Sequence, residues 1–118
     1  MASNFIKPGN HLTFTAAANV ASGGGVLLGT VLGVALTTVA SGAKGEAAVS
    51  GVWELPKASG AAMNAWTKPI WDTATNAFIA SGATTGDLLN GAVVVEDAAS
   101  AATKVKVRLL PGAGSLSP

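Results

Sequence analysis

The amino-acid sequence predicts an all-β fold, a small antiparallel β-barrel or sandwich with an extended N-terminal arm and at most one short helical turn. Two stretches, 46–55 and 104–109, alternate between apolar and other residues with the period of two that is typical of half-buried strands. Turns rich in glycine and serine separate the apolar runs at nearly regular intervals. Short strands joined by such turns favour a barrel or sandwich.

The two alternating stretches each end a unit of similar pattern, which is an apolar strand, a turn of small residues and an alternating strand. In the first unit the apolar strand runs from Gly25 toward Val39, and Trp53 lies on the inner face of the alternating strand. Two pairs of segments align between the units: Gly33–Leu36 with Gly91–Val94, and Glu46–Val49 with Lys104–Val107. We predict two related units that build one core. Chance similarity between short, alanine-rich segments is the alternative.

The rest of the chain divides where its composition changes. Residues 1–9 are predicted to form an extended arm, because Pro8 lacks a backbone donor and the segment has no periodic pattern. A single β domain over 10–110 follows, and 111–118 is expected to be a flexible tail. The domain opens with a strand at His11–Thr15, whose inner face carries Leu12 and Phe14.

A hairpin region is predicted between the two units. Its strands are Ile70–Asp72 and Ala77–Ile79, and its turn is 73–76, where aspartate and asparagine side chains commonly bind nearby backbone N–H groups. The one place for a short helical turn is 56–65, although Gly60 disfavours it.

Composition limits the possible functions. The 118 residues suit one domain with a sizeable core, and the absence of cysteine excludes disulfides, thiolate metal sites and a cysteine nucleophile. Only 11% of the residues are charged and the net charge is +1, so the chain has no strong field for nucleic acid.

The inventory of reactive groups predicts no enzyme, no cofactor and no metal site. His11 is the single histidine and is expected to be a solvated strand residue. Glu96 and Asp97 are neighbours in the sequence, so they are expected in a solvated turn instead of an acid–base pair. The glycine-rich segment 23–29 lacks the Gly-Lys-Ser/Thr that completes a phosphate-binding loop.

A membrane span is an alternative interpretation of the apolar segment. Gly25, Gly29 and Gly33 have the spacing of packed membrane helices, and no charged residue lies between Lys7 and Lys44. The strongly apolar part is shorter than a usual span, however, and valine and threonine favour strands. We predict no membrane contact.

Two sets of side chains are candidates for contact with a partner. Lys104, Lys106 and Arg108 form a basic stripe, which is either a solvated face, a guarded edge strand or a contact for an acidic protein. The three tryptophans, Trp53, Trp66 and Trp71, are expected in the core or at a subunit interface. A sugar-binding platform, as in a small adhesive or glycan-binding β-module, is the alternative.

Several segments resemble a phage family that was long filed as a domain of unknown function. They are Asn4–Phe14, Gly33–Leu36, Gly51–Lys57, Trp71–Asp72 and Val105–Leu109, and the resemblance extends over roughly residues 3 to 110. Ala65–Ile70 departs from the family pattern. Members are identified as capsid cement or decoration proteins, or labelled RecA/RadA-like phage recombinases. The recombinase label does not suit this chain, because that chemistry needs a nucleotide-binding loop and a larger core.

The resemblance implies a structural protein of the virion. Such a protein binds the major capsid protein on the capsid exterior at subunit junctions, where it stabilises the shell against the pressure of packaged DNA. It implies a homo-oligomer, with a trimer at three-fold positions expected. The residues predicted to contact the capsid or a neighbouring subunit are those of the arm: Asn4, Phe5, Ile6, Lys7 and Pro8.

Overall fold

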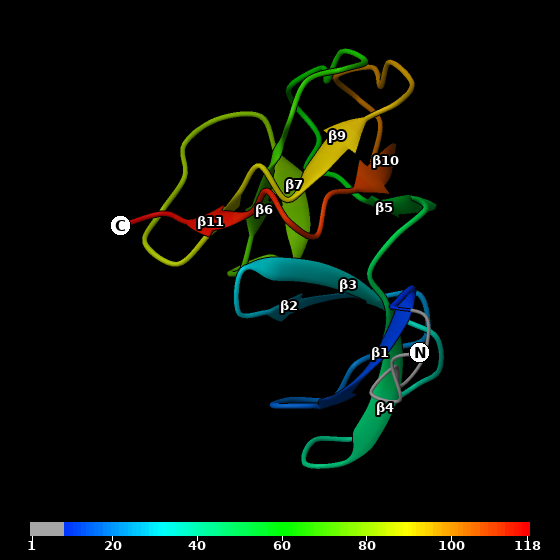
Figure 1. Ribbon diagram of the computed structural model, residues 1–118. Helices are drawn as coiled ribbons and strands as arrows, with labels where there is room; N and C mark the ends of the chain where they lie inside the picture. The colour runs from blue at the N-terminus through cyan, green and yellow to red at the C-terminus, as the bar shows by residue number, and fades with distance from the viewer. Residues whose placement is uncertain (1–8) are drawn as a thin grey trace, which may run out of the picture.

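The computed structural model describes residues 9–118, and in this range the chain forms strands joined by turns, with no helix (Figure 1). The strands are β1 (His11–Thr15), β2 (Gly25–Leu28), β3 (Val31–Ala35), β4 (Lys44–Ala48), β5 (Val52–Pro56), β6 (Ile70–Asp72), β7 (Ala77–Ile79), β8 (Leu88–Leu89), β9 (Ala92–Val94), β10 (Lys104–Leu109) and β11 (Ser115–Leu116). The predicted all-β class is therefore confirmed.

The strands pair as three antiparallel sheets. The first has the order β1-β4-β3-β2, the second β5-β10-β9 and the third β11-β8-β6-β7. A parallel bridge between Lys57 and Phe78 joins the end of β5 to β7, so the second and third sheets are continuous at this point. The sheets pack in a sandwich-like arrangement and do not close into a barrel.

The apolar segment after Gly25 is a hairpin, so the prediction of one strand there was wrong. β2 and β3 pair from Gly25↔Val34 to Leu28↔Val31, and Gly29 and Thr30 form the two-residue turn. Gly29 has φ 63°, a conformation that two-residue hairpin turns need and that glycine adopts at little cost.

The predicted strand 46–55 is also two strands, which belong to different sheets. β4 ends at Ala48 and β5 starts at Val52, and between them Gly51 has φ 98°. The serine and glycine between the two strands are compatible with a strand and with a turn. The alternation in the sequence therefore continues across the bend although the strand does not. Leu55 is fully buried as predicted, whereas Trp53 is only partly buried.

The predicted hairpin between the units is confirmed. β6 and β7 pair with Trp71 opposite Phe78, and their rings meet edge to face with centroids 4.9 Å apart. The carboxylate of Asp72 accepts hydrogen bonds from the Ala74 N–H at 3.0 Å and the Thr75 hydroxyl at 3.0 Å, which holds the turn. The segment 57–65 forms turns and two isolated bridges, at Lys57 and Met63, without the helical turn for which the sequence left room.

Two apolar clusters make up the core. The larger one joins all three sheets; its buried members are Leu32, Val34, Leu55, Met63, Trp71, Phe78, Leu88, Ala92, Val94, Val105, Val107 and Leu109. The smaller cluster lies within the first sheet, around Phe14 and Val39. β10 contributes Val105, Val107 and Leu109 to the larger cluster and exposes the residues between them, as its alternation predicts.

Two three-strand groups share one connectivity. In β1-β4-β3 and in β5-β10-β9 the strand that comes last in sequence lies between the other two. These groups differ in extent from the two units predicted at 25–55 and 88–109, and the relation between those units stays a prediction. The segment predicted as a tail, 111–118, carries β11, which pairs with β8, and the Ser117 N–H donates to the Asp87 carbonyl at 2.8 Å.

Candidate binding surfaces

The arm residues predicted to contact the capsid or a neighbouring subunit lie outside the described residues. They are Asn4, Phe5, Ile6, Lys7 and Pro8. The described chain starts at Gly9 and continues directly into β1, so the point from which the arm departs is known. Their role in contact stays a prediction.

β1 is an edge strand of the first sheet, and no strand of residues 9–118 pairs with its outer side. The Val49 N–H donates to the Asn10 carbonyl and the Ala16 N–H donates to the Ala43 carbonyl, each at 2.9 Å. Because bonded pairs alternate along an antiparallel ladder, the backbone groups of His11, Thr13 and Thr15 point away from β4. An edge of this kind can accept one further strand.

A groove of about 470 Å³ runs along β2, the other edge of the first sheet. Small and apolar residues line most of it, among them Val20, Val26 and Leu28, and Asn76 also lines it. The lining residues within 9–118 are small, apolar or uncharged polar ones. The groove therefore offers mainly apolar surface.

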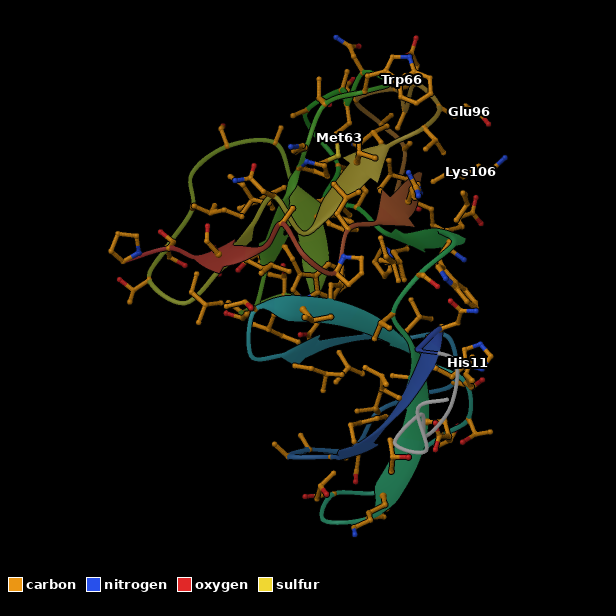
Figure 2. All side chains as sticks on the ribbon, in the orientation of Figure 1. His11, Met63, Trp66, Glu96 and Lys106 are labelled. Carbon is orange, nitrogen blue, oxygen red and sulfur yellow. The ribbon has the colours of Figure 1, made fainter. Side chains whose placement is uncertain are left out.

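The basic stripe belongs to the central strand of the second sheet, which excludes the guarded-edge interpretation. β10 lies between β5 and β9, and its side chains Lys104, Lys106 and Arg108 are exposed on the outer face. Lys106 Nζ donates to Glu96 Oε2 at 3.3 Å, and both side chains are at least half exposed, so the pair is worth little in water. Figure 2 shows both side chains on the surface.

The three tryptophans have three different environments. Trp71 is buried at the centre of the larger core. Trp53 packs partly against that core, and its Nε1–H donates to the Ser50 carbonyl at 2.9 Å. Trp66 is 75% exposed, so it is not a core residue. Of the two places predicted for the tryptophans, the core and an interface, an interface is the one that suits Trp66. This residue lies at one end of the molecule, whereas His11, the first residue of β1, lies in the other half (Figure 2).

The candidate catalytic residues are not brought together. His11 is exposed on β1, and Asp97 Oδ1 accepts a hydrogen bond from the Ala65 N–H at 2.7 Å. Over residues 9–118, no three histidine, cysteine, aspartate or glutamate side chains cluster as a metal site would require. The same range contains no helix of the length and hydropathy that crossing a membrane demands.

Two buried polar side chains that the sequence analysis did not single out hold loops in place. Asp87 is fully buried and accepts four hydrogen bonds of 2.9 to 3.2 Å from the N–H groups and hydroxyls of Thr73 and Thr84. The Thr84 N–H is the main cause that lowers the pKa of Asp87, and burial opposes it. The run Thr84-Thr85-Gly86-Asp87 was the available signal, since short polar side chains and glycine are typical of such turns.

Lys57 is the other buried polar residue, with 3% of its surface exposed. Its Nζ donates to the carbonyls of Ala58, Ser100 and Ala102 at 3.0 to 3.4 Å. The ammonium group takes the place of water as the hydrogen-bond donor to these three carbonyls. Its bonds connect the end of β5 to the loop before β10. Nothing in the local sequence distinguishes this lysine from a solvated one.

Comparison with known proteins identifies the family of the chain. A family profile described as phage cement protein matches residues 6–109. The chain belongs to the phage cement protein family. The match runs from the arm through β10 and so includes strands of all three sheets. Neither the curated proteins nor the solved structures include a significant match.

Membership of the cement family gives the surfaces above a context. It supports association with a phage capsid and a structural role in the virion. The outer edge of β1, the basic face of β10 and the exposed Trp66 are then candidate contacts with neighbouring proteins.

Proposed function

We propose that this cement protein binds the outer surface of the capsid at junctions between major capsid protein subunits and stabilises the shell against internal DNA pressure. The observation that carries the proposal is the family match over residues 6–109. Removal of about 1,000 Å² of apolar surface from water contributes on the order of 25 kcal/mol before the costs of association. A few such contacts across a seam therefore oppose its separation.

The arm is the proposed contact segment, through Asn4, Phe5, Ile6, Lys7 and Pro8. Phe5 and Ile6 contribute about 1.5–3 kcal/mol each when fully covered. Fixing roughly nine residues costs about 1–2 kcal/mol per residue, so two side chains are not enough. Backbone pairing with a neighbour's strand edge supplies the remainder. The outer edge of β1, which no described strand covers, supports this proposal.

A homotrimer at three-fold positions of the capsid is the proposed assembly. A closed cyclic oligomer on a matching symmetry axis makes the same contacts with each surrounding capsid subunit, and these contacts add through effective concentration. Cryo-EM of decorated capsids tests the position and the copy number directly. Density at three-fold axes on the outer surface is expected, and density inside the shell would contradict the proposal.

Deletion of Ala2–Pro8 tests the arm separately. Melting temperature and solution mass per subunit should stay nearly unchanged, while the affinity for capsids falls at least about tenfold. A truncated protein that still decorates capsids at wild-type affinity would exclude the arm as a contact, and one that unfolds would place the arm in the core.

Stabilisation of the shell is tested by heating. Capsids that carry the wild-type protein should release DNA at a higher temperature than undecorated capsids.

A further inference from the structure

Trp66 is the most exposed of the large apolar side chains in the described chain. Its exposed fraction is 75%, compared with 59% for Val52, 44% for Leu116 and 40% for Leu12. A tryptophan buries more apolar area than any of these residues when it meets a partner. The fold holds Trp71 in its core, so the exposure of Trp66 is specific to its position.

The backbone of Trp66 has a conformation that its side chain disfavours. Its φ is 71°, and the other residues between 9 and 118 with positive φ are glycines, Asn76 and Asn90. Asparagine and glycine adopt this region readily, whereas a bulky side chain there is a true outlier. Such outliers cluster at functional sites, because the surrounding structure must hold them in place.

Hydrogen bonds on both sides hold the loop 63–67 in place. The Trp66 N–H donates to the Val94 carbonyl at 2.6 Å, and the Val94 N–H donates to the Thr67 carbonyl at 2.8 Å. Met63 and Ala98 exchange two backbone bonds of 2.8 and 2.9 Å, and Asp97 accepts from the Ala65 N–H. The indole is therefore presented from a fixed backbone that continues the second sheet beyond β9.

We propose that Trp66 is the anchor residue of the capsid-binding surface and that its indole enters an apolar pocket on the capsid protein. This inference rests on the proposed function. Tryptophan is among the residues that dominate binding energy at protein interfaces, and an anchor that is fixed in advance loses little entropy on binding. Trp66 is such a residue, and the backbone that carries its exposed indole is held in advance by hydrogen bonds.

The area of the contact favours the capsid over a second copy of the chain. One indole buries about 150–250 Å², far below the roughly 1,200 Å² of a stable pairwise interface. The flanking Asn64, Thr67 and Lys68 are exposed and polar, and therefore do not extend the apolar area. A small contact of this kind suits a lattice, where several attachments act together.

Trp66 lies well apart from the edge strand β1. His11, the first residue of β1, lies in one half of the molecule, while Trp66 lies at one end of the other half (Figure 2). The longest dimension of the molecule is 48 Å. A contact through Trp66 therefore engages the capsid at a place separate from the edge of β1.

The test titrates wild type, Trp66→Asn and Leu116→Ala onto undecorated capsids assembled from the major capsid protein encoded with this chain. Asparagine accepts positive φ, so Trp66→Asn should keep or raise the melting temperature while it weakens capsid binding at least about tenfold. Leu116→Ala removes another exposed apolar side chain and should bind within about twofold of wild type. Trp66→Gly serves as a second variant should the asparagine variant fail to fold.

Wild-type affinity of a folded Trp66 variant for capsids would overturn the role of Trp66 and leave the proposed function intact. A lower solution mass of Trp66→Asn without capsids would assign the residue to contacts between copies instead. Binding of wild type to a glycan array that Trp66→Asn loses, with equal capsid affinity, would assign it to sugar recognition. Failure of wild type itself to bind capsids would overturn the proposed function and this inference together.

Discussion

The indole ring of Trp71 lies directly against the backbone of Gly25, so closely that a Cβ at position 25 would come within 2.5 Å of two ring carbons. Gly25 begins β2 in the first sheet, and Trp71 is in the middle of β6 in the third. The contact is therefore one of the places where the two halves of the molecule pack together. Figure 1 shows the β2–β3 hairpin lying next to the sheet that contains β6.

Gly25→Ala should destabilise the fold by about 1–3 kcal/mol, because the methyl group must displace a ring that is already buried among close neighbours. Urea denaturation followed by tryptophan fluorescence measures the change. Gly112→Ala is the matched control, since a Cβ there meets no atom within 4 Å. Equal midpoints for the two variants would show that the ring moves aside freely.

Trp71→Ala should cost about 3–5 kcal/mol, since the side chain is 99% buried in the core cluster. Trp66→Ala removes a side chain of the same type from an exposed position and should change stability by no more than about 0.5 kcal/mol. Trp53→Ala should fall between them because Trp53 is partly buried. Thermal denaturation of the three variants in parallel gives the order, and a large loss for Trp66→Ala would contradict its solvent exposure.

Lys57→Met should destabilise the protein by about 1–3 kcal/mol, although methionine has a similar length and suits an apolar site. The substitution removes the donor that satisfies three carbonyls, those of Ala58, Ser100 and Ala102. Lys104→Met, on the exposed face of β10, is the control and should stay within about 0.5 kcal/mol. Urea midpoints compare the two, and a neutral Lys57→Met would mean that water replaces the ammonium.

Asp87 should make stability fall in acid. Its pKa in the folded protein lies below the ordinary value of 3.8, so its carboxylate stabilises the fold fully above that value. The unfolded chain binds the proton first as pH falls, and the contribution is lost between 3.8 and the lower folded pKa. Asp87→Asn should therefore be less stable than wild type at pH 7, and the difference should shrink below pH 3.8. Urea midpoints over this range measure it; a constant difference would contradict the assignment.

The sequence patterns were most reliable where polar and apolar residues contrast strongly. In β10, charged residues alternate with valine and leucine, and only one register buries the apolar side chains. The β6–β7 hairpin was equally clear, because Asp72 and Asn76 mark its turn. The pattern failed at Gly29 and Gly51, where the chain turns at glycines that fit a strand pattern and a bend equally well.

The candidate contacts were harder to predict, because they depend on the exposure and the long-range partners of single side chains, which a sequence pattern does not give. The three tryptophans look alike in the sequence, and only the folded structure shows that Trp66 is exposed and that its loop pairs with Val94. Pairing of Lys57 with carbonyls from a distant loop leaves no local pattern either. The arm was chosen from its composition, and the described residues do not include it.

The pairing of β5 with β10 has a consequence for the order of folding. Pro56 pairs with Lys104, so the second sheet cannot form until most of the chain is available, whereas the first sheet uses only residues 11–48. Closing a long loop is slow, and transiently exposed strand edges and apolar surface favour aggregation. During synthesis, the inner face of the β2–β3 hairpin, with Leu32 and Val34, therefore stays uncovered until the strands that complete its core cluster have left the ribosome.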